Sequence, residues 1–391
     1  MKIAYFYTSK TKGQDLLWGL VKNGHKIEIY TKDSNAYDRG ETFEKERALI
    51  EEFIKARMCD CAMSWNFFPA VSDACMKLGI PYVSWIFDSP LLHIYCKEAL
   101  NSCNYVFSLD RVETEELRSK GIKAFHLPMG VNTDRLNALD IKDEQIAEYS
   151  GDVAFVGSLY QNNPYNLLAL PGDVKEKYDA LFGRQLGDWT RNYLYEEFGP
   201  EDEEIFAKYA YGRINGIQDY ELISPKYLYC GLMMSRRMAE IERAYILNTL
   251  AEDFNVTLYN SADDHSVLNG VECRPAVAYE TIAPIVYFST KINLNFTLKS
   301  IQTGIPLRVF DISAVGGFVM SNYQEEFEEC YKPGQDIETF RTLDELVDKT
   351  RFYLTHERER LIIAMNGYRR TCAEHTMNQR VAKIFDIMKQ E

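Results

Sequence analysis

The stretch KINLNFTLKSIQTGIPLRVFDISAVGGFVMSNY, residues 291–323, decides how the fold of this chain is interpreted. It begins with a short apolar run, continues through a Gly-Ile-Pro turn at 304–306, and reaches a Gly-Gly pair at 316–317 before a second apolar run. This order predicts a strand, a turn, a helix over 307–315 and another strand. Pro306 fits the first turn of that helix, where its missing N–H costs nothing, and the first glycine of the pair ends it.

Arg308 and Asp311 give the predicted helix a candidate binding function. A helix N-terminus carries partial positive charge and free amides, which suit a phosphate group. Arg308 in the first turn runs against the preference for acidic residues there, and a nearby anion would explain it. Asp311 lies about one turn further along the same face, where it would accept hydrogen bonds from ribose hydroxyls. A solvated Arg–Asp pair on a helix surface explains the same two residues about equally well.

Segments 291–295 and 303–311, together with the Gly-Gly pair, resemble the nucleotide-sugar-binding half of GT-B glycosyltransferases. Within that class they resemble the branch of spore-coat maturation proteins of the CgeB type. The resemblance implies an α/β protein with two Rossmann-like domains that face each other across a cleft, the second of which binds a nucleotide-diphosphate sugar. The nucleotide-site residues that it implies in this stretch are Lys291, Asn295, Arg308 and Asp311. A solvated lysine at the start of a strand explains Lys291 equally well.

One position departs from the pattern of many retaining GT-B enzymes. Those enzymes carry two carboxylates separated by seven residues, and the second carboxylate binds the ribose. Asp311 occupies the second position, as Asp in place of the usual Glu, and Thr303 occupies the first. The missing first carboxylate leaves both retaining and inverting stereochemistry open.

The composition narrows the class of protein. The chain has 391 residues, enough for two domains, and a formal net charge of -14, which argues against a general nucleic-acid binder. No apolar run approaches the roughly 18 residues that span a bilayer, and the N-terminal apolar segment is too short for a signal peptide. We therefore expect a cytoplasmic protein. The nine cysteines lack the paired spacing of a zinc site, so buried free thiols are the expected interpretation.

Residues 1–150 predict a first Rossmann-like domain on the acceptor side of the cleft. Its opening strand, helix and strand indicate a parallel sheet, and polar residues follow the expected strands at Asn66, Asp88 and Asp110. Asp88 is the best-placed candidate for the catalytic base, although an Asp-Ser-Pro sequence more often caps a helix. His93 is a second catalytic candidate, and simple packing is its more frequent role. Asp110 and the arginine after it are expected to form a solvated turn.

Residues 151–375 predict the nucleotide-sugar domain, with a helical, aromatic-rich insertion over about 167–229. Gly157 and Ser158 follow a new apolar strand, and small residues at such a turn let the backbone approach a diphosphate. Tyr279 follows a later strand, near which the resemblance to GT-B proteins implies the nucleotide base and ribose, and a place in the core explains Tyr279 equally well. In this class of protein the last helix, here 376–391, packs back on the first domain.

The sequence thus predicts a glycosyltransferase that moves a sugar from a nucleotide-diphosphate sugar, with UDP as the expected nucleotide, to an acceptor hydroxyl. The resemblance implies a glycan or protein acceptor in a surface polymer or glycoprotein, and no metal is needed if cationic side chains and helix amides neutralise the diphosphate. A catalytically inactive nucleotide- or sugar-binding protein is the main alternative. A sugar-nucleotide epimerase, which would turn over the donor without an acceptor, is the third.

Overall fold

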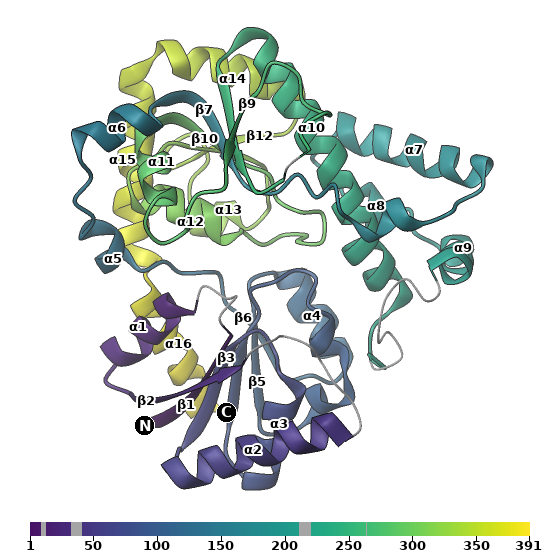
Figure 1. Ribbon diagram of the computed structural model, residues 1–391, viewed down its shortest axis with the longest axis vertical. Helices are drawn as coiled ribbons and strands as arrows, with labels where there is room; N and C mark the ends of the chain where they lie inside the picture. The colour runs from purple at the N-terminus through teal and green to yellow at the C-terminus, as the bar shows by residue number, and fades with distance from the viewer. Residues whose placement is uncertain (9–12, 33–40, 211–219, 263) are drawn as a thin grey trace.

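The computed structural model describes residues 1–8, 13–32, 41–210, 220–262 and 264–391. These residues form two domains, which lie one above the other in Figure 1. Each domain is built around one six-stranded sheet. Every strand pair in both sheets is parallel. The predicted fold class, two Rossmann-like α/β domains, is confirmed.

The first sheet has the order β2-β1-β3-β4-β5-β6. Its strands are β1 (Lys2–Thr8), β2 (Lys26–Lys32), β3 (Cys61–Trp65), β4 (Tyr82–Trp85), β5 (Asn104–Ser108) and β6 (Ala124–His126). The helices of this half are α1 (Gln14–Lys22), α2 (Glu41–Arg57), α3 (Pro69–Leu78), α4 (Arg111–Ser119), α5 (Thr133–Asn137) and α6 (Asp143–Tyr149), with 3-10 turns η1 (Leu92–Tyr95) and η2 (Lys97–Leu100). Strands β3 and β4 are buried at every residue, as expected for a sheet that is covered on both faces.

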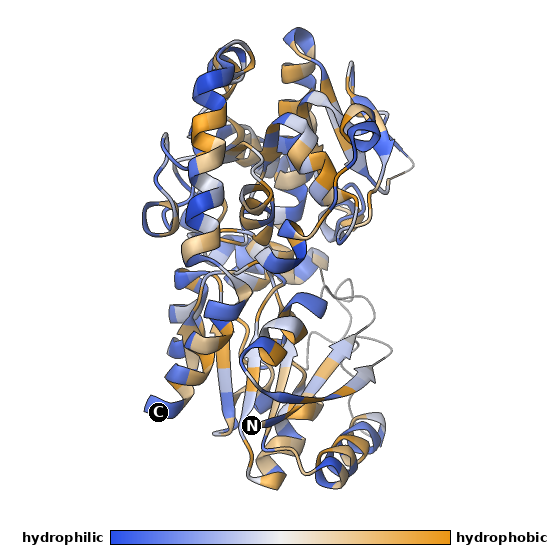
Figure 2. Cartoon of the chain, turned by 90° about the vertical axis from the view of Figure 1, so that its left-hand side faces the viewer, coloured by the Kyte–Doolittle hydropathy of each residue, from blue (hydrophilic) through white to orange (hydrophobic). Residues whose placement is uncertain are grey.

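The second sheet has the order β12-β11-β10-β7-β8-β9. Its strands are β7 (Gly151–Val156), β8 (Val256–Asn260), β9 (Glu272–Pro275), β10 (Thr290–Asn295), β11 (Val319–Asn322) and β12 (Glu338–Phe340). The helices that follow the insertion are α10 (Ser235–Asp253), α11 (Ala283–Ser289), α12 (Leu307–Ala314), α13 (Phe327–Cys330), α14 (Leu343–Thr355), α15 (Glu357–Glu374) and α16 (Met377–Gln390). Apolar residues concentrate on the strands and polar ones on the outer helices (Figure 2).

The stretch at 291–323 forms β10, α12 and β11 in the predicted order. Pro306 is the N-cap of α12 and lies one position before the predicted first turn. Gly304 explains the Gly-Ile-Pro turn, because a Cβ at this position would lie 2.5 Å from the Leu109 carbonyl oxygen of the first domain. Glycine is required here because two backbones meet at the domain boundary.

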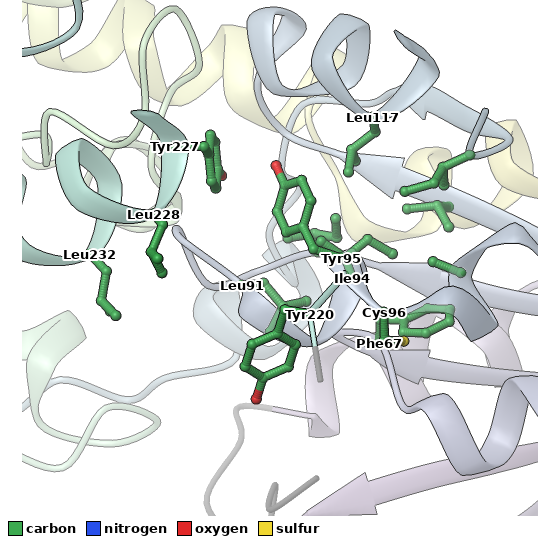
Figure 3. Packing of buried hydrophobic residues seen from close by; sticks show 14 of the residues in the cluster. Phe67, Leu91, Ile94, Tyr95, Cys96, Leu117, Tyr220, Tyr227, Leu228 and Leu232 are labelled. Carbon is green, nitrogen blue, oxygen red and sulfur yellow. The ribbon is translucent and has the colours of Figure 1, made fainter. Parts of the chain in front are cut away.

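The insertion lies at one side of both domains (Figure 1). Its elements are η3 (Pro164–Leu167), α7 (Gly172–Gly187), α8 (Tyr193–Glu196), α9 (Pro200–Ala210) and the π-helix η5 (Tyr227–Met234); residues 211–219 lie outside the described part. Its apolar residues share one buried cluster with the first domain, where the ring centres of Tyr227 and Tyr95 lie 5.0 Å apart (Figure 3). The insertion therefore packs against the first domain although it belongs to the second half of the chain.

Helix α16 returns to the first domain and packs on α1. A Cβ on Gly19 of α1 would lie 2.9 Å from Met377 Cγ, so the missing side chain allows this close approach. Asn23 Nδ2 donates hydrogen bonds to the backbone and side-chain oxygens of Asn378, at 3.1 Å and 2.9 Å. Among the described residues, no helix combines the length and the apolar composition needed to cross a membrane.

Candidate nucleotide-sugar site between the domains

A cavity of about 360 Å³ lies between the two domains, at the carboxyl edges of the sheets. The first domain contributes Phe87 and Leu109, which follow strands β4 and β5. The second domain contributes Gly157, Tyr279, Arg308 and Asp311, among others. The structure thus brings together four of the residues that the sequence assigned to the nucleotide site. Ligands of parallel α/β sheets bind at this edge.

Arg308 is held at the rim of this cavity by the strand beside it. Its Nη1 donates a hydrogen bond to Asn295 Oδ1 at 3.0 Å, and its guanidinium lies 5.0 Å from the centre of the Phe155 ring. Asn295 is fully buried at the end of β10, where its Nδ2 donates to Ser321 Oγ at 2.9 Å. Asn295 therefore orients Arg308 but does not itself line the cavity.

Arg243 is a second cation beside the Phe155 ring, outside the cavity lining, and sequence analysis missed it. The side chain comes from α10, is 3% exposed, and lies with its guanidinium 5.1 Å from the centre of the Phe155 ring. It donates hydrogen bonds to the carbonyl oxygens of Ser158 and, at 2.9 Å, Phe296. Burial, together with the charge of Arg308, lowers the pKa of Arg243 to about 10, so the group stays cationic at neutral pH.

The Gly157 turn leaves room for Arg308 and the Phe155 ring. A Cβ at this position would lie 2.7 Å from Phe155 Cζ and 2.9 Å from Arg308 Nη2. Ser158 is exposed directly after it, and its Oγ accepts a hydrogen bond from the Tyr160 backbone N–H at 3.0 Å. The end of β7 therefore combines exposed backbone with two guanidinium groups, which is the chemistry that suits a phosphate.

Asp311 and Tyr279 form the polar part of the same cavity beyond Arg308. Tyr279 Oη donates a hydrogen bond to Asp311 Oδ1 at 3.0 Å. Burial, followed by the charge of Asp311, raises the pKa of Tyr279 well above its ordinary value, so it remains a hydrogen-bond donor. Arg135 lies 5.7 Å from the centre of the Tyr279 ring and pairs with Asp15 at 2.7 Å, which ties this side of the cavity to the first domain.

Lys291 lies at the other end of β10, away from the cavity. Its Nζ pairs with Asp152 Oδ1 at 2.7 Å, and the side chain is half exposed. The register of the sheet places Thr290 opposite Gly151, at the amino ends of both strands. The structure therefore does not bring Lys291 to the residues around Arg308.

Asp88 lies beside the cavity rather than in its lining. It is exposed after Phe87, and its Oδ2 accepts a hydrogen bond from Asn66 Nδ2 at 2.8 Å. The prediction that Asp88 caps a helix is wrong, because the following turn η1 begins after Leu91 and has no side-chain cap. His93 lies within η1, 6.0 Å from the ring of Tyr220 in the insertion, and is not brought to the cavity.

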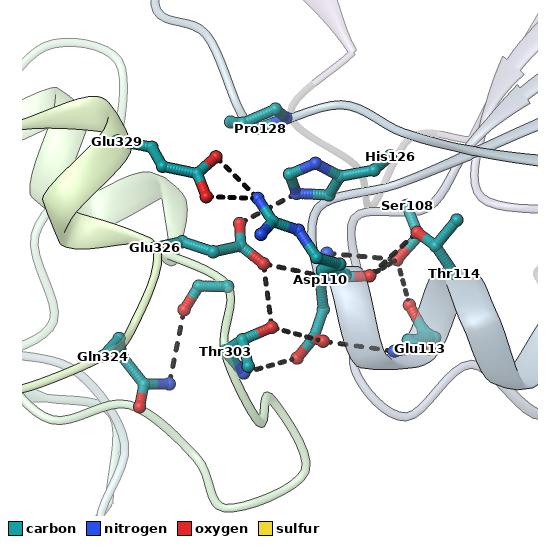
Figure 4. Close-up of polar contacts among 12 residues, drawn as sticks. Ser108, Asp110, Glu113, Thr114, His126, Pro128, Thr303, Gln324, Glu326 and Glu329 are labelled. Atoms are coloured by element: carbon teal, nitrogen blue, oxygen red, sulfur yellow. Dashed lines mark hydrogen bonds and ion pairs between the residues drawn. The ribbon is translucent and has the colours of Figure 1, made fainter.

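A polar network joins the two domains where the missing first carboxylate would be (Figure 4). Thr303 Oγ1 lies within hydrogen-bond distance of Asp110 Oδ1 at 3.1 Å and of Glu326 Oε1 at 2.8 Å. Glu326 Oε2 also contacts His126 Nε2 at 2.8 Å. The expectation of a solvated turn at Asp110 is wrong, because the residue is buried and accepts a hydrogen bond from the Glu113 N–H as the N-cap of α4.

Comparisons with known proteins agree with this architecture. Residues 238–386, from α10 to α16, match a family model described as "Glycosyl transferase-like". A protein of Aquifex aeolicus (strain VF5), described as uncharacterized, is 24% identical over 338 residues, which cover 80% of this chain and 76% of the relative.

The chain is also similar in structure to several solved proteins. A glycosyltransferase from Rickettsia africae ESF-5 superposes with a TM-score of 0.61 at 10% identity, over 100% of this chain and 98% of that one. Anabaena Alr3699/HepE in complex with UDP-glucose gives 0.57 at 9% identity, over 100% of both chains. The UDP-GlcNAc 2-epimerase from Neisseria meningitidis bound to UDP-GlcNAc gives 0.51 at 10% identity, over 100% of both chains. These similarities establish the GT-B fold, and membership of the CgeB-type branch stays a prediction.

Proposed function

We propose that this protein is a glycosyltransferase that binds a nucleotide-diphosphate sugar in the cavity between its domains and transfers the sugar to an acceptor hydroxyl. The observation that carries the proposal is the Arg308 guanidinium beside Gly157 in the lining of the same cavity as Asp311, with a second guanidinium, that of Arg243, 5.1 Å from the centre of the same Phe155 ring. A diphosphate would bind the two cations, and the nucleoside would extend toward Asp311 and Tyr279.

The proposed chemistry uses the two arginines to stabilise the leaving diphosphate as negative charge develops on it in the transition state. Asp311 would anchor the ribose and so orient the donor. Two fixed cations supply the charge that a divalent metal would otherwise provide, so we propose that no metal is required. UDP is the proposed nucleotide because Anabaena Alr3699/HepE, which shares the fold, was solved with UDP-glucose.

Asp88 is the proposed base for the acceptor hydroxyl. It follows Phe87, a residue of the cavity lining, and its exposed carboxylate is oriented by Asn66. A base must reach the hydroxyl at roughly 2.6–3.2 Å or through one water, which a residue at the mouth of the cavity can do when an acceptor is bound. The acceptor itself is proposed to be a glycan or a glycoprotein.

Two other functions have specific support. Thr303 stands where many retaining enzymes have a carboxylate, and its hydroxyl contacts Asp110 and Glu326. The lack of that carboxylate favours a protein that binds the nucleotide sugar without transferring it. The similarity to an epimerase bound to UDP-GlcNAc favours turnover of the donor alone. Nucleotide release that requires an acceptor supports the transferase, turnover of the donor's sugar without an acceptor supports the epimerase, and binding without turnover supports the binding protein.

The experiment that tests the proposed function is a thermal-shift panel of UDP-, GDP-, CDP- and dTDP-sugars, each with and without magnesium. A ligand at 100 times its dissociation constant stabilises the folded state by about 2.7 kcal/mol, which shifts the melting temperature measurably. We expect a shift with UDP-sugars that does not depend on magnesium. A panel without any shift would contradict the proposal.

A further inference from the structure

Two buried carboxylates join the domains beside the nucleotide-sugar cavity (Figure 4). Asp110 stands directly before helix α4 of the first domain and Glu326 directly before helix α13 of the second, and each residue is only 2% exposed. Each carboxylate accepts hydrogen bonds from backbone N–H groups of the other domain. The Thr303 hydroxyl contacts both carboxylates, and we call these three residues the interdomain clamp.

Asp110 binds its own helix and the second domain at the same time. Its Oδ1 accepts a hydrogen bond from the Glu113 N–H at 3.1 Å, which caps α4. Its Oδ2 accepts hydrogen bonds from the backbone N–H of Gln302 and, at 3.2 Å, from that of Thr303. One carboxylate therefore satisfies backbone donors of both domains, and hydrogen bonds to an ionised acceptor are the stronger kind.

Glu326 makes the reverse connection, from the second domain to the first. Its Oε1 accepts a hydrogen bond from the Arg111 N–H, in the first turn of α4, at 2.9 Å, and its Oε2 lies 2.8 Å from His126 Nε2. The first N–H groups of a helix have no partner within the helix, so a side chain must supply one. The N-terminus of α4 is therefore capped from both sides of the domain boundary.

The interdomain clamp adjoins the nucleotide-sugar cavity along the chain. Leu109 and Ile301, which come directly before Asp110 and Gln302, both line that cavity. The chain crosses between the domains at α5 and between α15 and α16, and α5 and α16 lie to the left of α4 in Figure 1. A hinge motion about these crossings would separate α4 from the loop after β10, and the clamp opposes this separation.

We propose that the interdomain clamp holds the two domains closed in the free protein and has to open before a nucleotide can enter or leave the cavity. All contacts of the clamp are made between protein groups, so it forms without a ligand. A carboxylate at position 303, as many retaining enzymes have, would be repelled by Asp110 and Glu326, whereas the Thr303 hydroxyl fits between them. The gating of nucleotides rests on the proposed function, and closure of the free protein does not.

The first test is hydrogen–deuterium exchange of the free protein, read by mass spectrometry on peptides that contain Gln302 or Arg111. Asp110→Asn keeps one oxygen that can cap α4 and replaces the other with an amide nitrogen, which accepts no hydrogen bond. Exchange at Gln302 should become roughly ten- to a hundredfold faster, the effect of one lost charge-assisted hydrogen bond. Glu326→Ala should have the same effect at Arg111. Glu328→Gln, an exposed position of α13, should change neither.

Small-angle X-ray scattering of the same proteins separates domain opening from the loss of a local hydrogen bond. Without nucleotide, Asp110→Asn and Glu326→Ala should have a larger radius of gyration than the wild type, and Glu328→Gln should not. A single unfolding transition in urea shows that each variant is folded. The inference is overturned if both clamp variants keep the wild-type radius of gyration, or if exchange at both peptides is unchanged.

The second test is the rate at which a fluorescent UDP analogue leaves the protein after mixing with excess UDP. Release from Asp110→Asn and from Glu326→Ala should be at least roughly tenfold faster than from the wild type, because one charge-assisted contact fewer has to break. Open variants that release the analogue at the wild-type rate would overturn the gating. A wild type that is closed but binds no UDP would contradict the proposed function and the gating with it, and would still support the closed clamp.

Discussion

Glu113 provides a quantitative prediction about the contact between the insertion and the first domain. Its carboxyl is buried in the first turn of α4, where it accepts hydrogen bonds from Ser108 Oγ and from Tyr227 Oη of the insertion. Burial raises the pKa of Glu113 from 4.5 to about 7, although the two hydrogen bonds act in the opposite direction. The folded protein thus holds a proton that the unfolded chain releases above pH 4.5.

The sign and size of the effect follow from this difference in pKa. An acid whose pKa is higher in the folded state makes the free energy of unfolding fall as pH rises, here between about pH 4.5 and pH 7. The two pKa values give a loss of roughly 2.5 kcal/mol between pH 5 and pH 8. Glu113→Gln keeps the shape and removes the titration. The free energy of unfolding of the variant, relative to wild type, should therefore increase by about 2.5 kcal/mol between pH 5 and pH 8.

The assay is urea denaturation of both proteins at pH 5 and pH 8, followed by circular dichroism and by fluorescence to confirm a single transition. Glu115→Gln serves as the control, because Glu115 lies on the same helix with its side chain 63% exposed. The control should show no pH-dependent difference from wild type. A difference between Glu113→Gln and wild type that is the same at both pH values would refute the reasoning.

Three further substitutions test the contacts at the cavity and the domain boundary. Gly157→Ala places a Cβ against Phe155 and Arg308, so UDP affinity should fall in a calorimetric titration, whereas Gly172→Ala, with open space around it, should bind normally. Tyr279→Phe removes the hydrogen bond to Asp311 and should weaken UDP binding by about 1 kcal/mol with no loss of melting temperature beyond a few degrees. Gly304→Ala forces apart the backbones that meet at Leu109 and should lower the free energy of unfolding by about 1–3 kcal/mol in urea; unchanged stability would show that this contact gives way easily.

Local signals in the sequence predicted much of the fold. The patterns over 14–22 and 41–57 predict helices with the same bounds as α1 and α2. The sequence Thr342-Leu-Asp-Glu345 predicts a capping box, and Thr342 indeed caps α14 by accepting a hydrogen bond from the Glu345 N–H at 3.2 Å. The sequence pattern does not predict helix α15, because the exposed face of this helix carries Leu361 and Ile362 and the helix so lacks clearly separate polar and apolar sides.

The sequence predicts the site residues that lie in one continuous stretch. It does not predict those whose positions depend on contacts between distant segments of the chain. Arg308 and Asp311 share one helix with a recognisable turn before it. Arg243 lies inside α10, for which the pattern over 233–254 predicts a helix, and the carbonyl groups that it binds are 85 and 53 residues away in the chain. The pairing of Lys291 with Asp152 depends on the register of two strands that are far apart in sequence, which no local pattern indicates.

The measurement that tests the central claim most directly is a calorimetric titration of UDP into the wild type, Arg308→Gln and Lys291→Gln, without metal. Loss of one charge-assisted hydrogen bond contributes about 1.5–3 kcal/mol, so Arg308→Gln should bind UDP roughly ten- to a hundredfold more weakly. Lys291→Gln should bind as the wild type does, because its ammonium pairs with Asp152 away from the cavity. Binding of UDP to Arg308→Gln with wild-type affinity, or no binding to the wild type, would contradict the account.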